Sequence, residues 1–102
     1  MTVSAKDRKV EVLQLLKGVI HTVLPDEEMK LFIFGSQAGL QEWKNADIDV
    51  GIEMKKPIDW EKLETIKSMV DGIPTVYKFD IVDFGRVSES FRTVAMKKTE
   101  PI

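Results

Sequence analysis

The sequence predicts one α+β domain over residues 1–102, because segments with a helical apolar period alternate with segments that have a strand pattern. A chain of this length buries roughly two thirds of its unfolded surface but leaves no room for a second lobe. The 15 basic and 17 acidic residues give a net charge of −2. The chain therefore lacks the positive surface with which proteins follow nucleic-acid backbones.

The composition also indicates the cellular setting. The sequence contains no cysteine, which excludes disulfide bonds, thiolate metal sites and cysteine nucleophiles. The first residues lack the apolar core of a signal peptide, and no apolar run approaches the roughly 20 residues that span a bilayer. These features predict a soluble, cytoplasmic protein that does not bind membranes.

The first predicted element is a helix, with Ser4 or Thr2 as its capping residue and Pro25 just beyond its end. Its apolar residues follow the helical period and are Val12, Leu13, Leu16, Val19, Ile20 and Val23. The apolar run 31–34 is short, contains two phenylalanines and stops at Gly35. This run therefore predicts a strand that is covered on both faces.

A turn and an alternating strand are predicted next. We expect residues 36–43 to begin with a short helix capped by Ser36. Polar and apolar residues then alternate over 47–53, so a strand places Asp47 and Asp49 on one face. The other face carries Ile48, Val50 and Ile52. A strand with a carboxylate pair on one face is expected to expose that face to a polar site.

A second helix is predicted from Pro57 and Asp59 to about Gly72. Its apolar stripe consists of Trp60, Leu63, Ile66, Met69 and Val70, and we expect Trp60 to lie in the core.

The last predicted elements are a strand over 75–83 and a helix after Gly85. The strand carries Tyr77, Phe79 and Ile81 on one face, and Val76, Lys78, Asp80 and Val82 on the other. The helix contains Val87, Phe91, Val94 and Ala95. A charged tail is expected from Lys97 onward.

The Gly35–Ser36 pair and three aspartates suggest metal-assisted nucleotidyl transfer. A strand that turns at glycine and serine offers backbone N–H groups and a hydroxyl to phosphate oxygens. If the second and third strands are neighbours, Asp47, Asp49 and Asp80 converge on one polar face. Carboxylate oxygens suit Mg²⁺, so we expect two ions, with Asp47 and Asp49 bridging both and Asp80 beside the acceptor.

These motifs resemble a known signature. The Gly35–Ser36 pair, a ten-residue spacer, Asp47-Ile48-Asp49 and the later strand 78–82 are similar to those of the minimal nucleotidyltransferase (MNT) proteins of the DNA polymerase beta-like superfamily. The resemblance covers about residues 30–84. It implies a small mixed sheet with helices packed on one face, ATP or another NTP as donor and Mg²⁺ as the working ion. It also implies that Gly35 and Ser36 contact phosphates and that the three aspartates bind metal.

Small members of this family are commonly encoded beside a HEPN-domain protein, with which they form toxin–antitoxin pairs. In such pairs the MNT protein can transfer AMP to a tyrosine of the toxin. The resemblance therefore implies a HEPN-type partner and an antitoxin role, with the partner supplying the acceptor hydroxyl. Open sheet edges in so small a domain also allow self-association.

Two departures from the family pattern leave a second function open. Gln37, Gly39 and Gln41 occupy a segment in which many relatives carry arginine, and the last helix is short. Loss of a cation would weaken triphosphate binding. The chain is therefore either an active transferase or a binding module that neutralises its partner by covering it. An Asp-x-Asp phosphohydrolase would need a larger parallel sheet than this length supplies.

Four other residues are each given a separate prediction. Lys78 shares the strand face of Asp80 and is assigned as a phosphate contact. Asp83 is expected at a surface or strand end, with a supporting role at the site left open. His21 is expected at the surface without a role. Trp43 is expected to pack over its loop rather than to stack on a base.

Overall fold

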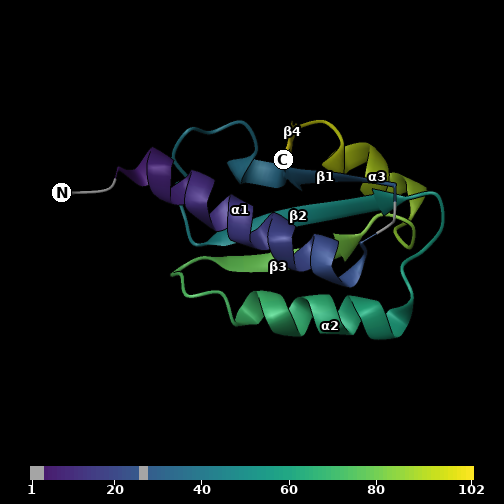
Figure 1. The fold of residues 1–102 in the computed structure, drawn as a ribbon. Coiled ribbons are helices and arrows are strands. Elements are labelled where there is room, and N and C mark those ends of the chain that lie inside the picture. Colours follow the sequence, from purple (N-terminus) through teal and green to yellow (C-terminus); the bar gives the residue numbers. More distant parts are fainter. Residues whose placement is uncertain (1–3, 26–27) are drawn as a thin grey trace.

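The computed structural model describes residues 4–25 and 28–102 and shows helices packed against a mixed sheet (Figure 1). Thr2, the alternative cap of the first helix, lies outside the described residues. The elements, in chain order, are α1 (Ala5–Val23), β1 (Met29–Phe34), the 3-10 turn η1 (Gly35–Gln37), β2 (Asp47–Met54), α2 (Trp60–Asp71), β3 (Lys78–Asp83), α3 (Glu89–Ala95) and β4 (Thr99–Pro101).

The sheet has the strand order β3-β2-β1-β4. Strand β1 runs antiparallel to both β2 and β4, whereas β2 and β3 are parallel. The predicted mixed sheet is therefore confirmed. Strand β4 was not predicted, because the segment 99–101 was interpreted as part of a charged tail. Three residues are too few to show an alternating pattern.

Serine residues start two of the helices. The Ser4 side chain accepts a hydrogen bond from the Asp7 N–H at 3.1 Å, and Ser88 accepts one from the Phe91 N–H at 3.1 Å. Each bond satisfies a backbone donor that the first turn of a helix leaves free. The predicted Ser4 cap is confirmed. Ser88 is a cap that the sequence analysis did not identify.

One face of the sheet packs against α1 and α2 and forms the main core. Its fully buried side chains come from α1 and its C-cap residue, α2, the loop before α2 and the sheet, and they are Leu16, Ile20, Leu24, Ile33, Ile48, Val50, Ile52, Ile58 and Ile66. Each such side chain contributes about 1.5–3 kcal/mol when it leaves water. The predicted inward face of β2 is thus confirmed.

The opposite face carries a smaller aromatic cluster beneath α3. Phe32, Phe34 and Phe84 pack with Ala95, and the rings of Phe32 and Phe84 meet edge to face at 4.8 Å. Both faces of β1 are therefore covered, as predicted. Gly51 lies under these rings, where an added Cβ would approach the Phe32 ring to 2.4 Å. The aromatic cluster can form only because β2 has no side chain at this position.

Trp60 is not in the core. Its side chain is 58% exposed, and the Arg86 guanidinium lies over the ring at 5.8 Å. The prediction was wrong because Trp60 is the first residue of α2, and the side chains of this helix that pack against the sheet begin only one turn later. Leu63, Ile66 and Val70 form the buried stripe of this helix instead.

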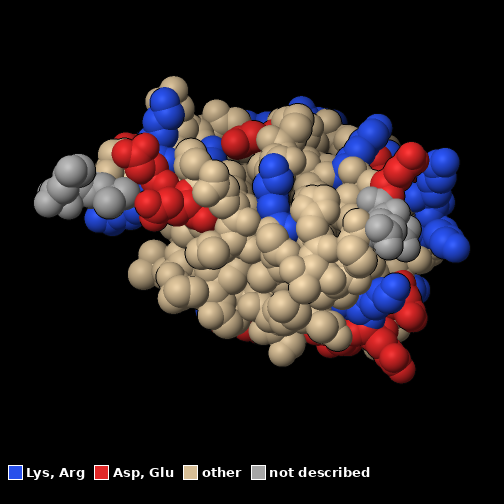
Figure 2. All heavy atoms as spheres, in the orientation of Figure 1, with Lys and Arg blue, Asp and Glu red and all other residues tan. Residues whose placement is uncertain are grey.

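The surface on the α1 side of the molecule carries charged side chains of both signs (Figure 2). Figure 2 shows the side that α1 covers, where acidic and basic side chains gather toward the two ends and uncharged atoms fill most of the middle. No continuous basic tract crosses the part of this face that the described residues form. Among the described residues, no helix is both long and apolar enough to cross a membrane.

Candidate active site

The three predicted carboxylates come together at one end of the sheet. Asp47 and Asp49 are in the first three residues of β2, and Asp80 is the third residue of β3. The parallel register places Asp49 directly opposite Asp80 and Asp47 opposite Lys78. Neighbouring strands are about 4.8 Å apart, so these side chains share one small area. That area lies on the face opposite α1 and α2, since Ile48 and Val50 fill the main core.

The charges in this area repel one another. Burial raises the pKa of the Asp49 carboxyl, and the nearby carboxylates of Asp80 and Asp47 raise it further. Negative charges held together in this way bind a proton or a cation more readily than isolated ones. The raised pKa of Asp49 is thus an electrostatic sign that the three side chains act as a group.

The glycine–serine turn lies against this carboxylate group. Gly35 follows β1 directly and has a φ of +80°, a conformation that side chains rarely adopt. A Cβ at Gly35 would lie 2.9 Å from Asp49 Oδ2. Glycine is therefore required here by both the backbone and the space beside Asp49. The turn and the aspartates, ten residues apart in sequence, are in direct contact range.

Ser36 has a different setting from the one predicted. It lies inside η1, not at the start of an α-helix, and the residue before η1 makes no side-chain cap. Ser36 Oγ accepts a hydrogen bond from Gln37 Nε2 at 3.0 Å. Because the oxygen is the acceptor in this bond, the hydroxyl proton of the exposed Ser36 side chain remains available for a phosphate oxygen.

Gln37 is a structural residue of the loop between β1 and β2. Its side chain is buried, and its Oε1 accepts a hydrogen bond from the Lys44 N–H at 2.6 Å. Gln37 thus joins the two ends of the loop while its amide group holds Ser36. The Gln37 amide group is therefore hydrogen-bonded through both its nitrogen and its oxygen.

Trp43 packs in the same loop, as predicted. Its ring meets Tyr77 at 4.7 Å and Phe79 at 6.0 Å between ring centres, both edge to face. The Trp43 indole N–H is buried without an acceptor among the described residues. Aromatic contacts therefore hold this ring in place, and through them the loop is fixed to the start of β3.

An open cleft of about 740 Å³ runs from the carboxylates along the β3 edge of the sheet. Lys78 lines it together with the three aspartates, and the C-terminal end of α2 and the segment 73–77 form the remaining wall. Asp71 reaches the same cleft from α2, away from the strand face. The cleft is large enough for a nucleotide or a segment of another chain.

The donor set fits magnesium in chemistry. Three carboxylates supply hard oxygen ligands, and their mutual repulsion at Asp49 is what a cation would relieve. Within residues 4–25 and 28–102, however, no group of three or more acidic or histidine side chains is arranged closely enough to hold a metal ion on its own.

Asp83 plays a role that the sequence analysis missed. It ends β3, as expected, but it is buried: its carboxylate accepts the Ile58 N–H at 2.9 Å and the Gly85 N–H at 2.8 Å, and pairs with Arg86 at 3.2 Å. It fixes the entry to α2 and does not face the cleft carboxylates. The Asp-Phe-Gly sequence was the available signal, because the aspartate side chain often accepts a hydrogen bond from the backbone N–H two residues on.

His21 is exposed, as predicted.

Comparison with known proteins identifies the family. A family model described as polymerase beta, nucleotidyltransferase, matches residues 19–102. The chain belongs to this nucleotidyltransferase family. The family predicted from the motifs is thus confirmed, and the matched range includes the turn, all three aspartates and the whole sheet.

One curated relative and three solved structures are similar to this nucleotidyltransferase. The relative is a probable protein adenylyltransferase MntA from Haemophilus influenzae, 26% identical over 91 residues that cover 89% of this chain and 78% of that protein. A crystal structure from Shewanella oneidensis gives a TM-score of 0.63 at 14% identity, covering 88% of this chain and 68% of that one.

The two other structures are toxin–antitoxin complexes. One is described as a tri-AMPylated Shewanella oneidensis HEPN toxin with an MNT antitoxin (TM-score 0.57, 18% identity, 91% of this chain and 69% of that one). The other is a toxin–antitoxin with AMP-PNP (TM-score 0.53, 21% identity, 83% and 70% coverage). At these identities the structures show the nucleotidyltransferase fold that the chain shares with them.

Proposed function

We propose that this nucleotidyltransferase moves AMP from ATP to a hydroxyl group of a HEPN-type toxin and so acts as its antitoxin. The observation that carries the proposal is the position of Asp49, which lies opposite Asp80 and so close to the turn that a Cβ added at Gly35 would be 2.9 Å from Asp49 Oδ2. A phosphate-binding turn and a carboxylate group are thereby within reach of the same substrate. The name of the Haemophilus influenzae relative and the AMPylated toxin complex support AMP as the transferred group.

The turn would bind and orient the triphosphate. The Ser36 hydroxyl donates to a phosphate oxygen, because its oxygen already accepts from Gln37. The backbone at Gly35 carries no side chain that would block the phosphates. Lys78 supplies a positive charge to the same region, because it lines the cleft from β3 and lies opposite Asp47 of β2. These contacts fix the α-phosphorus relative to the acceptor.

The carboxylates would bind the metal ions, and one of them would accept the proton of the acceptor hydroxyl. Asp47, Asp49 and Asp80 would hold two Mg²⁺ ions, which when bound offset the triphosphate charge and lower the pKa of the acceptor hydroxyl. The acceptor oxygen bonds to the α-phosphorus while the bond from that phosphorus to the pyrophosphate oxygen breaks. The hydroxyl proton passes to Asp80, the carboxylate beside the acceptor, and pyrophosphate leaves.

A second function rests on the loop after the turn. Gln37 is held by the loop backbone, and Gly39 has no side chain, so neither supplies the cation found in many relatives. With a weakened phosphate site, the protein would neutralise its partner by binding and covering it, without turnover. In this alternative the protein has the same fold and the same partner but does not transfer AMP.

One experiment separates the two functions. The protein is incubated with Mg²⁺, the product of the neighbouring gene and ATP labelled at the α-phosphate. AMP transfer predicts labelled partner with the wild type and at least about a hundredfold less with Asp49→Asn. Asp71→Asn is the matched control, since Asp71 lines the same cleft outside the strand face, and it should label normally. Neutralisation that survives Asp49→Asn without any label would establish covering instead.

A further inference from the structure

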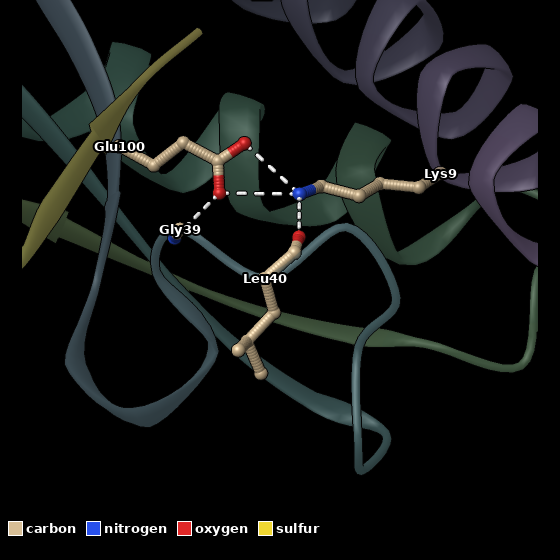
Figure 3. Close-up of polar contacts among 4 residues, drawn as sticks. All are labelled: Lys9, Gly39, Leu40 and Glu100. Carbon is tan, nitrogen blue, oxygen red and sulfur yellow. Dashed lines mark hydrogen bonds and ion pairs between the residues drawn. The ribbon is translucent and has the colours of Figure 1, made fainter.

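A partly buried ion pair joins two distant parts of the chain, α1 and β4, to the loop after the Gly35–Ser36 turn (Figure 3). Lys9, on α1, pairs with Glu100, on β4, at 2.9 Å. Its ammonium also donates to the Leu40 carbonyl, and Glu100 Oε1 accepts the Gly39 N–H at 2.8 Å. The close-up shows the Lys9 and Glu100 side chains meeting over the backbone of the loop. We call these four residues the loop clamp.

The clamp satisfies a charge that would otherwise destabilise the fold. The Lys9 side chain is only 9% exposed, and a buried ammonium needs close acceptors to offset its lost hydration. Glu100 and the Leu40 carbonyl supply these acceptors, and the Trp43 ring lies 5.5 Å from the ammonium. Lys9 is therefore fully engaged by protein groups and acts on the loop, not on a phosphate.

The loop clamp binds the backbone of the loop that connects the Gly35–Ser36 turn to β2. Gly39 and Leu40 are four and five residues after Gly35 in the chain. Gly39 has a φ of +81°, so the backbone reverses sharply where Glu100 receives its N–H. On one side of this point Gln37 holds the Ser36 hydroxyl. On the other side Trp43 packs against Tyr77, next to Lys78 on β3.

We propose that Lys9 and Glu100 are positioning residues for nucleotide binding: they fix the loop so that Ser36 and Lys78 stay in place for the triphosphate. This inference rests on the proposed function. It assigns the N-terminal helix and the last strand a role at a site to which neither contributes a side chain. The prediction is specific to the loop, because both partners touch its backbone directly.

The test compares two ion pairs whose acidic partners are similarly exposed. Glu100→Ala removes both contacts, whereas Glu100→Gln keeps an oxygen that can accept the Gly39 N–H. The control is Glu53→Gln, which breaks the Arg92–Glu53 pair between α3 and β2. Glu53 is 20% exposed and Glu100 is 24% exposed, so the two substitutions remove comparable charges. Each variant is assayed for AMP-PNP affinity with Mg²⁺ and for thermal unfolding.

We expect Glu100→Ala to weaken AMP-PNP binding by about tenfold or more, the usual effect of losing a residue that holds a binding group in place. Glu100→Gln should lose less, and Glu53→Gln should bind within twofold of the wild type although its Tm also falls. If Glu100→Ala does not fold because the Lys9 charge is left unpaired, Lys9→Met combined with Glu100→Ala replaces it, since this pair is neutral and lacks both backbone contacts, and we expect the same loss of affinity.

The outcomes also separate this inference from the proposed function. A wild type that binds AMP-PNP together with Glu100 variants of unchanged affinity and lowered Tm would overturn the clamp's positioning role alone. Equal losses of affinity in Glu53→Gln and Glu100→Ala would overturn it too, since a general loss of stability would then explain both. A wild type that binds no AMP-PNP at all would overturn the proposed function and the inference together.

Discussion

Asp49 and Asp80 lie directly opposite each other on the parallel strands β2 and β3. Like charges in this position destabilise a sheet, and the raised pKa of Asp49 reflects that repulsion in addition to burial. A strand pair selected for stability alone would not keep two such side chains. The arrangement indicates that stability has been exchanged for a binding site, as is common where charged groups act on a substrate.

Asp49→Asn should therefore stabilise the protein while it removes activity. A raised folded pKa means that the charged carboxylate costs stability above that pKa, and that the cost disappears as the pH falls through it. The variant should exceed the wild type by less than about 1 kcal/mol near neutral pH, because water screens partly exposed charges. The difference should shrink toward acidic pH. Urea unfolding at several pH values measures it, and a variant less stable than the wild type at pH 7 would contradict the repulsion.

Nucleotide should stabilise the protein only together with magnesium. The grouped carboxylates repel one another and would also repel a triphosphate, so nucleotide should need Mg²⁺ in order to bind. With AMP-PNP about a hundredfold above its Kd, stabilisation of about 2.7 kcal/mol would raise Tm by about 10 °C in a domain of this size. Chelation of Mg²⁺ by EDTA should abolish the rise. An equal rise in EDTA would show that the carboxylates do not act through metal.

Gly35→Ala should damage both stability and the site. The substitution strains a backbone with φ of +80° and places a Cβ 2.9 Å from Asp49 Oδ2, for a cost of about 2 kcal/mol or more. Gly39→Ala is the stability control, because its φ is +81° and no described atom outside its chain neighbours lies within 4 Å of an added Cβ. The extra loss in Gly35→Ala, measured by urea unfolding, reports the Asp49 contact. Identical losses would mean that the turn does not press on Asp49.

Asp83→Ala should unfold more easily without losing its chemistry. The buried carboxylate holds two backbone N–H groups and Arg86, so its removal should cost about 3 kcal/mol. AMP transfer per folded molecule should stay near that of the wild type at a temperature where the variant is folded. The control is Asp71→Asn. Asp71 is an exposed acidic residue, so this substitution should change the free energy of unfolding by less than about 0.5 kcal/mol. A loss of transfer in folded Asp83→Ala would assign this residue to the site.

Much of the site could be predicted because its residues sit on a strongly patterned strand. Strict alternation along β2 fixes which side chains face the core, so Asp47 and Asp49 had to face the other way. The pairing of Asp49 with Asp80 could not be predicted in the same way. It depends on a parallel register set by packing of the whole sheet, which no local pattern encodes.

The remaining differences have local causes. Trp60 was misplaced because the first turn of α2 lies beyond the edge of the core. Glu100 was assigned to a charged tail because nothing in the nearby sequence indicates β4. This strand is stabilised by pairing with β1 and by Lys9, a residue 91 positions away. Contacts between the two halves of the chain leave no periodic trace in either segment. The clamp could therefore be recognised only in three dimensions.

The central place of β1 in the sheet determines which parts of the site can move. Phe34 is paired with Asp49 on one side and with Thr99 on the other, so the backbone is anchored up to the last residue before Gly35. Opening this strand would require two ladders to separate at once, and its amide hydrogens should exchange with solvent slowly. The backbone before Gly35 should therefore keep its place when substrate enters, and the strands keep the carboxylates at a fixed spacing.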